Sequence, residues 1–561
     1  MLCFAAFDDR LGQDLSQEGM RYLFGVDGVP AGAPLSYEKG ILSCETTGDE
    51  ALGLACIVDL DRLASARQQG DPEVGPLGTV MLQTCQVRAR KGPMLLSLEL
   101  ARQRVMSFLN KLEDWGLFDL EADHPIMEAF NAGRALFTRA LVAHAGDGDG
   151  PGGYDAAVDR IACRALIQVH AAGEELAREQ SRRLWARRVD GTLHREASEH
   201  YERVQDESPP PGAPILLPSS IGVVLPGRPL IGCAVNPKLF SEPLARVASS
   251  ACDFVTMPVR WRDIEPQEGK YVFGPTDRWI EWAVRTAKMP VAAGPLIDFR
   301  PSAVPEWLYI WENDYETLRE LVAEHVKQVV TRYRRTVRRW TVLSGVHVNK
   351  SFPMTFEQMM DLTRICVGLV RRLHPQANVV IELDRPWGEY FAFNRKSVPP
   401  QLYAEMVLQA QIPIDGIGLR VQFGADARPA RDLLSLSAML DRFSELEKPL
   451  LLTAVGAPSD PVPGADAALG SWHGPATEAL QAEWLTEVVS IAACKPYMHS
   501  VCWSELYDHD ATPSLPGAGL ISRTGAAKPA LQRLAEIKRA TRAAVSPLAP
   551  AGAAPTAPAG G

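Results

Sequence analysis

The sequence has no long apolar run and no excess of basic residues, and each absence argues against a class of partner. No uninterrupted apolar stretch approaches the roughly 18 to 20 residues that a membrane-spanning helix needs, so we expect no membrane partner. Lysine and arginine number 58 against 68 aspartate and glutamate residues, which gives a formal net charge of −10. A chain of this sign is poorly suited to neutralising phosphate backbones, so we expect no nucleic-acid partner either.

Paired cysteines and a signal-like start are also missing. The ten cysteines are scattered, at positions such as Cys3, Cys85, Cys163 and Cys494, without a CxxC pair. Neither a zinc site nor a disulfide framework is indicated, no other ligand spacing is visible, and we expect no metal and no cofactor. The opening residues, MLCFAAFDDR, lack the basic region of a secretory signal. We therefore predict buried thiols in a reducing, cytoplasmic protein, with export by another route left open.

Composition changes along the chain predict several parts. Residues 1–90 combine short β-branched runs with Gly, Pro and Asp turns, which predicts a small β-rich module, interpreted as a carbohydrate-binding or scaffold surface. Residues 91–205 repeat apolar side chains at helical spacing and predict a helical segment. Residues 206–224 are proline-rich and predict a stiff linker, whereas residues 544–561 are mostly Ala, Pro and Gly and predict a disordered tail.

Residues 225–543 alternate short hydrophobic runs with longer helical patterns, which is typical of βαβ units around a parallel sheet. The expected strands are LIGCAVN, FVTMPV, PVAAGPLI, RRWTVLS, NVVIELD, GIGLRVQ, LLLTAV and HSVCWSE. Eight such strands predict an α/β fold of the (β/α)8 TIM-barrel type, preceded by the β module and the helical segment. In this architecture the chemistry lies at the carboxyl ends of the strands.

The second expected strand runs into VRWRDIEPQEGKYVFGPTD, residues 259–277. This segment resembles the signature of glycoside hydrolase family ten, the xylanase family. Arg260 stands where the family has lysine, and Trp261, Glu265 and Phe273 are among the residues that match directly. The segments AAGPLIDF, WTVLSG, DGIGLRVQ, KPLLLTAV and WSELYD follow in the family's order. The resemblance implies a barrel that handles β-1,4-linked oligo- or polysaccharides.

The resemblance also implies two glutamates that this chain lacks. A retaining glycosidase needs two carboxyl groups about 5 to 5.5 Å apart, one acting as acid/base and one as nucleophile. Alignment with the family places Gly345 at the acid/base and Ala454 at the nucleophile, and strand three has Pro295 in place of a histidine. Neither Gly345 nor Ala454 carries a side-chain oxygen, so the family's double displacement is not expected to operate.

The strand ends still hold polar and aromatic residues of the kinds that bind sugars. The predicted substrate-binding residues are Arg260, Trp261, Asp298, His347, Asn349, Trp387, Arg420, Gln422 and Trp503. The candidate replacements for the catalytic pair are Glu382, Asp384, Glu389 and Glu505. The alternative for any of these residues is an ion pair that closes the top of the barrel, such as Arg260 with Glu382.

Three functions are compatible with this pattern. The first is a pseudoenzyme that binds oligo- or polysaccharide without hydrolysing it. The second is an active O-glycosyl hydrolase that uses relocated carboxylates. The third is a non-catalytic structural or assembly protein. An open groove favours the first two, whereas a cleft plugged by loops or by the front part of the chain favours the third.

Overall fold

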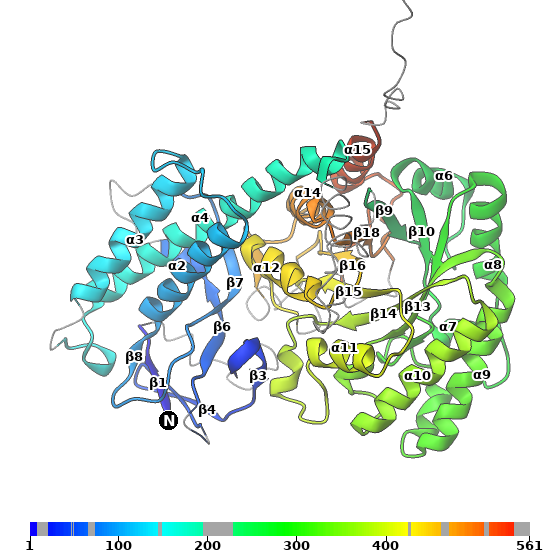
Figure 1. The fold of residues 1–561 in the computed structure, drawn as a ribbon, viewed down its shortest axis with the longest axis horizontal. Helices are drawn as coiled ribbons and strands as arrows, with labels where there is room; N and C mark the ends of the chain where they lie inside the picture. The colour runs from blue at the N-terminus through cyan, green and yellow to red at the C-terminus, as the bar shows by residue number, and fades with distance from the viewer. Residues whose placement is uncertain are drawn as a thin grey trace, which may run out of the picture.

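The computed structural model describes residues 1–7, 21–46, 48, 50–64, 73–143, 148–193, 228–424, 428–461, 470–509 and 515–543. The predicted linker 206–224 and tail 544–561 lie outside these residues. A front part, made of residues 1–193, lies beside a barrel (Figure 1). Among the described residues, no helix has both the length and the apolar character needed to cross a membrane.

The barrel is a closed, parallel sheet with eight strand positions. Its strands are β9 (Leu230–Ala234), β10 (Phe254–Met257), β11 (Val291–Ala293), β12 (Ile297–Asp298), β13 (Val337–Ser344), β14 (Asn378–Asp384), β15 (Gly416–Gln422), β16 (Leu450–Gly456) and β18 (Met498–Trp503). The strands β11 and β12 share the third position and are separated by a cis Gly294–Pro295 peptide. Pairing of β18 with β9 closes the sheet, so all eight predicted strands and the TIM barrel are confirmed.

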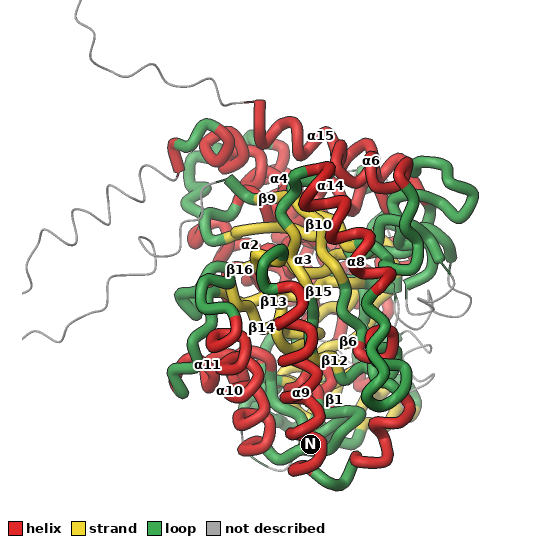
Figure 2. Tube along the Cα trace, turned by 90° about the vertical axis from the view of Figure 1, so that its right-hand side faces the viewer, coloured by secondary structure: helices red, strands yellow, loops and turns green. Residues whose placement is uncertain are grey.

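Helices and helical turns surround the strands (Figure 2). They are α6 (Glu242–Ala251), α7 (Trp261–Ile264), α8 (Gly274–Glu281), η5 (Trp282–Ala287), η6 (Glu306–Trp311), α9 (Tyr315–Tyr333), η7 (Val346–Val348), α10 (Phe356–Leu373), η8 (Glu389–Ala392), α11 (Pro400–Gln409), α12 (Leu433–Ser444), α14 (Glu478–Cys494) and α15 (Pro529–Ala543). Local signals begin several of them: Thr355 and Gln358 form a capping box at α10, and Asp432 caps α12. The helices bury their apolar faces against the sheet in one continuous core.

The front part contains two small sheets and three long helices. Its elements are β1 (Leu2–Ala5), β2 (Arg21–Phe24), η2 (Val26–Gly28), β3 (Pro30–Ala31), β4 (Leu35–Glu38), β5 (Ile41–Cys44), β6 (Gly53–Asp59), α1 (Leu60–Leu63), β7 (Gly78–Gln83), β8 (Met94–Leu95), α2 (Leu96–Asp114), α3 (Pro125–Ala143), η4 (Pro151–Gly153) and α4 (Ala156–Val189). This order confirms a β module followed by helices. The ten cysteines are free thiols, and all except the half-buried Cys3 are buried.

Buried contacts join the front part to the barrel. A short barrel strand, β17 (Ser471–Trp472), pairs antiparallel with β7. Arg104 of α2 forms two hydrogen bonds with Asp432, at 3.0 and 2.5 Å, and both side chains are almost fully buried. Glu174 of α4 binds His473 at 2.6 Å, and α4 extends across to the barrel helices α14 and α15 (Figure 1). The front part is therefore packed onto the barrel through matched charges.

Candidate functional site

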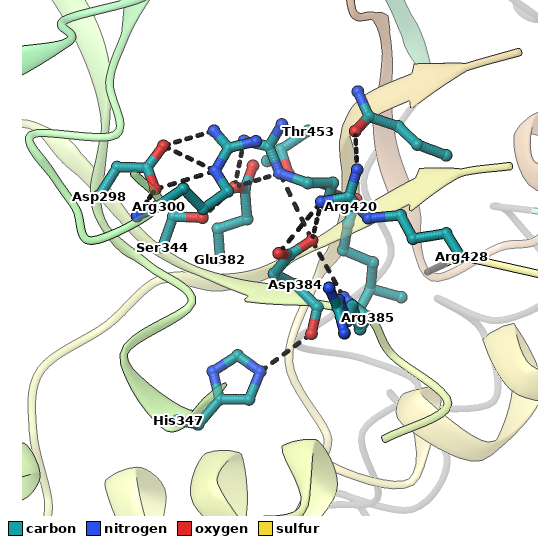
Figure 3. A network of polar contacts seen from close by, with 12 residues as sticks. Asp298, Arg300, Ser344, His347, Glu382, Asp384, Arg385, Arg420, Arg428 and Thr453 are labelled. Carbon is teal, nitrogen blue, oxygen red and sulfur yellow. Dashed lines mark hydrogen bonds and ion pairs between the residues drawn. The ribbon is translucent and has the colours of Figure 1, made fainter. Parts of the chain in front are cut away.

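The carboxyl ends of the barrel strands hold a network of charged side chains (Figure 3). Asp298 ends β12, Ser344 ends β13 and Asp384 ends β14. Glu382 lies two residues before Asp384 and therefore faces the same side of the strand. Arg420 is the pairing partner of Asp384 on β15. The parallel barrel thus gathers these five side chains at the end where barrel enzymes keep their chemistry.

Glu382 holds the centre of this network. Its Oε1 accepts hydrogen bonds from Ser344 Oγ at 2.5 Å, from Arg420 Nη2 at 2.7 Å and from Arg420 Nε at 3.0 Å. The residue is 3% exposed. Because three donor atoms bind this one carboxylate oxygen, the Glu382 side chain is fixed by Ser344 and Arg420. This agrees with the alternative that ion pairs close the top of the barrel.

Two further carboxylates are held as anions. Asp384 accepts from Arg428 Nη2 at 3.1 and 3.2 Å; burial alone raises the pKa of Asp384, but Arg428, Arg420 and Arg300 together hold it well below its usual range. Asp298 accepts a hydrogen bond from Arg300 Nε at 2.9 Å. Burial raises the pKa of Asp298, but Arg300 outweighs burial, and the net pKa lies below its usual value. A general acid must keep its proton near neutral pH, so neither carboxyl is suited to that role.

Glu505 lies two residues beyond the end of β18. Arg260 Nη2 lies 3.6 Å from Glu505 Oε1, and His509 Nε2 lies 3.2 Å from its other oxygen. The predicted pair of Arg260 with Glu382 is therefore wrong. The reason is strand order: β10 and β18 both flank β9, which brings Arg260 to Glu505, whereas Glu382 lies beside β15 and pairs with Arg420.

The turn after β14 is directed toward the front part. Glu389 is 2% exposed and lies in η8, which contacts β2 and β3. The pKa of Tyr22 on β2 is raised mainly by burial; Arg431 lowers it and the negative charge of Glu389 raises it. The Trp387 ring packs against Phe423 at 5.7 Å, with the Arg431 guanidinium 5.1 Å from the ring centroid. Glu389 and Trp387 therefore lie at the interface between front part and barrel, outside the network around Glu382.

Two of the predicted sugar-binding tryptophans are enclosed by the core. Trp261 is 2% exposed, stacks on His325 at 4.4 Å and donates its indole N–H to Glu265 at 2.7 Å. Trp503 is 1% exposed and donates to the Ala518 carbonyl at 2.8 Å. A buried indole seeks such a partner for its N–H, and both rings then lack an open face. This corrects the predicted aromatic surface at Trp261 and Trp503.

His347 and Asn349 organise the loop after β13. His347 is fully buried, its Nε2 lies 3.0 Å from the Asp384 carbonyl oxygen, and burial lowers its pKa to about 4. Asn349 donates to the Met354 carbonyl at 2.9 Å and to the Lys396 carbonyl at 2.7 Å. Both side chains are engaged with backbone groups, so their first role is to fix the shape of this loop.

Gly345 and Ala454 lie at the two positions that the family resemblance assigns to catalysis. Gly345 has φ +64°, in the left-handed region, although a Cβ built there would meet only the Asp384 Cβ, at 3.6 Å. A glutamate at this position would carry a conformational cost of roughly 1 to 2 kcal/mol. Ala454 is 6% exposed on β16. The backbone at Gly345 thus favours glycine for its own geometry.

Two cavities open at this end of the barrel. The inner one has a volume of about 90 Å³, and its charged lining residues are Arg260, Asp298, Arg300, Glu382, Arg420 and Glu505. The outer one measures about 520 Å³ and lies among the loops after β12, β13 and β14, next to Gly345. Ligand sites usually measure roughly 300 to 1,000 Å³, so only the outer cavity of the two reaches that size.

Three basic residues at these cavities were not singled out from the sequence. Arg385 directly follows Asp384, and Lys350 directly follows Asn349, so extending each predicted position by one residue would have found them. Arg428 follows no motif; it donates to Gln422 Oε1 at 2.8 Å as well as to Asp384. Only the three-dimensional path of the chain brings Arg428 into the network.

The comparisons with known proteins agree with this architecture. Residues 225–456 match the family model described as Glycosyl hydrolase family 10, which confirms the resemblance stated for the barrel. Endo-1,4-beta-xylanase B of Thermotoga neapolitana is 30% identical over 201 residues, covering 35% of this chain and 55% of that protein. Endo-1,4-beta-xylanase B of Humicola insolens is 24% identical over 177 residues, covering 31% of this chain and 46% of that protein. The chain spans about half the length of the curated relatives it matches.

Solved structures of xylanases also match. Xylanase 10B from Thermotoga petrophila RKU-1 in complex with xylobiose matches with a TM-score of 0.42 and 18% identity, over 56% of this chain and 94% of that chain. Native xylanase 10B from Thermotoga maritima matches with a TM-score of 0.43 and 18% identity, over 56% of this chain and 95% of that chain.

Proposed function

From the premise that the barrel matches glycosyl hydrolase family 10, we propose that this protein binds an oligo- or polysaccharide in its outer cavity without hydrolysing it. The observation that carries the proposal is the pair Gly345 and Ala454, which leaves both family positions without a carboxyl group. Without an acid to protonate the leaving oxygen and a nucleophile to form the glycosyl intermediate, the family's double displacement has no reacting groups.

The remaining carboxylates support the absence of hydrolysis. Asp298 and Asp384 are bound by arginines that lower their pKa values, which removes them as proton donors near neutral pH. Glu382 is held by Arg420 and Ser344. A relocated mechanism through Glu382 and Glu505 would have to break these contacts before either carboxylate could act.

The outer cavity supports saccharide binding. It is lined by the exposed side chains of Ser302 and Lys350 and the half-buried side chains of Arg300 and Arg385. Polar groups of this kind hydrogen-bond to sugar hydroxyls, and the volume of about 520 Å³ lies within the usual range of ligand sites. The cavity is next to Gly345, one of the two positions that the resemblance assigns to catalysis, whereas Ala454 lines the inner cavity.

We expect the purified protein to release no reducing ends from β-1,4-linked xylo-oligosaccharides, and to bind at least one of them with measurable heat. Calorimetry and a reducing-end assay on the same samples check both halves of this prediction. Ser302 is exposed and lines both cavities, so Ser302→Trp should weaken binding roughly tenfold, about 1.4 kcal/mol. Ser250→Trp, at an exposed position on α6, is the matched control and should bind like the wild type.

The Glu382→Gln and Glu505→Gln variants separate the competing functions. Turnover in the wild type that disappears in either variant would replace this proposal with a glycosidase that uses relocated carboxylates. If the wild type shows neither reducing-end release nor binding heat, a structural or assembly role for the barrel and its packed front part is supported instead.

A further inference from the structure

A groove separate from the two barrel cavities lies where the front part meets the barrel. Its walls are the helices α2 and α12, which lie side by side at this junction (Figure 1). Side chains at helical spacing line it: Gln103, Ser107, Asn110 and Lys111 from α2, and Ser435 and Arg442 from α12. Residues three, four or seven apart share one face of a helix, so each helix contributes one face to the groove.

The groove is already formed and has the size of a ligand site. The buried pair of Arg104 and Asp432 joins its two walls, and both helices also contact α4. Its volume is about 350 Å³, and ligand sites measure roughly 300 to 1,000 Å³ and occur often where domains meet. A small ligand therefore fits between the two parts of the chain without any rearrangement of the helices.

The hydrogen-bonding groups of the groove are only partly used within the protein. Among the residues that the structure describes, the side chains of Asn110 and Arg442 form no hydrogen bond or ion pair. Gln103 donates to Ser107 Oγ at 3.3 Å. A primary amide offers two donors and one acceptor oxygen, and a guanidinium offers five donors. The groove thus presents both donors and acceptors to whatever fills it.

The two half-buried cations of the groove have carboxylates near them. Lys111 pairs with Asp114 at 2.8 Å. Burial lowers the pKa of Arg442, whereas nearby carboxylates, of which Asp27 has the largest effect, raise it. An anionic ligand would meet these carboxylates as well as the cations and would gain little from its charge. A neutral ligand with many hydroxyl groups matches the unused donors and acceptors better.

We propose that the groove between α2 and α12 is a second saccharide-binding site, which takes a short, neutral sugar chain. A sugar hydroxyl both donates and accepts, so it can bond to the amides of Asn110 and Gln103 and accept from Arg442. Trp387, predicted from the sequence as a substrate-binding residue, also lines this groove. The groove and the outer cavity share no lining residue, so this site goes beyond the proposed function and does not depend on it.

Calorimetric titration of the full chain with xylotriose tests the proposal, and two binding events per chain are expected. Asn110 is exposed on α2, so Asn110→Trp should fill the groove and weaken one event at least about tenfold. Arg442→Gln, which removes guanidinium donors, should weaken the same event several-fold. Leu109→Trp is the matched control, since the neighbouring Leu109 is 42% exposed and does not line the groove. Ser302→Trp should weaken the other event only.

The outcomes separate this inference from the function proposed for the outer cavity. Binding that Ser302→Trp weakens, with Asn110→Trp and Arg442→Gln unchanged from wild type, would overturn the second site and leave the outer cavity in place. Binding that only Asn110→Trp and Arg442→Gln weaken would support the groove and count against the outer cavity. Inorganic phosphate bound at the groove without any xylotriose binding there would replace this inference with an anion site. No xylotriose binding at all would overturn both proposals.

Discussion

Replacement of Asp432 by asparagine is expected to lower the free energy of unfolding by about 3 to 5 kcal/mol, because it leaves the buried Arg104 guanidinium without its anion. The two side chains are 7% and 1% exposed, so solvent cannot replace the lost partner. Burial alone raises the pKa of Asp432, but Arg104 and then His170 lower it well below its usual range. The carboxylate is thus charged throughout the neutral range, and asparagine removes that charge.

Urea unfolding at neutral pH measures this effect. Arg102→Gln, on the same helix, is the matched control, since Arg102 is 35% exposed and its pair with Glu99 should contribute less than about 1 kcal/mol. The double variant Arg104→Met, Asp432→Asn should lose less than the sum of the single losses, because neither charge is then left alone. A loss for Asp432→Asn no larger than that of Arg102→Gln would contradict the assigned role of this pair.

Mild acid is expected to destabilise the protein between pH 6.5 and pH 4. Burial lowers the pKa values of His170 and His347 to about 4 in the folded protein, whereas an unfolded histidine titrates near 6.5. Between these pH values the unfolded state binds protons that the folded state does not bind. The free energy of unfolding that is present above pH 6.5 is therefore lost as the pH falls. Each histidine accounts for roughly 3 kcal/mol over this window.

The range from pH 6.5 to pH 4 distinguishes the titration of the buried histidines from that of the buried carboxylates. Burial raises the pKa of Glu174, but His473 lowers it to a net value of about 2, so its contribution is lost only below about pH 4. Urea unfolding at pH 7.5, 6 and 5 should therefore report the histidines. His170→Leu should reduce the slope by up to about 1.4 kcal/mol per pH unit, since neither ring nitrogen of His170 has a hydrogen-bond partner among the described residues. An unchanged slope would argue against a buried neutral His170; the half-buried His124→Gln serves as control.

The barrel could be predicted from the sequence because its signals are local. Each strand is a short apolar run, and the parallel order follows from the helical stretches between runs. The segment after β10 carried the family resemblance, and the losses at Gly345 and Ala454 follow from an alignment of strand ends. None of these steps requires knowing which strands are neighbours in space.

The partners within the site could not be predicted in the same way. Arg260 meets Glu505 because β18 and β10 both flank β9, which is a property of the closed sheet. Arg428 reaches Asp384 from a segment without a motif. Trp503 looked like a sugar-binding surface, yet its ring is buried, since strand periodicity gives the side of a strand and not what covers it.

The helix α4 makes the barrel depend on the front part for some of its contacts. Its 34 residues lie against α2 and α3 on one side and against α12 and α14 on the other. Through Glu174 and Arg188 it supplies partners for barrel groups, among them the His473 ring and the Met498 carbonyl. A barrel inherited or transplanted without the front part would leave these groups unmatched at a newly exposed face. The front part is for this reason integral to the fold and not an interchangeable module attached to a barrel.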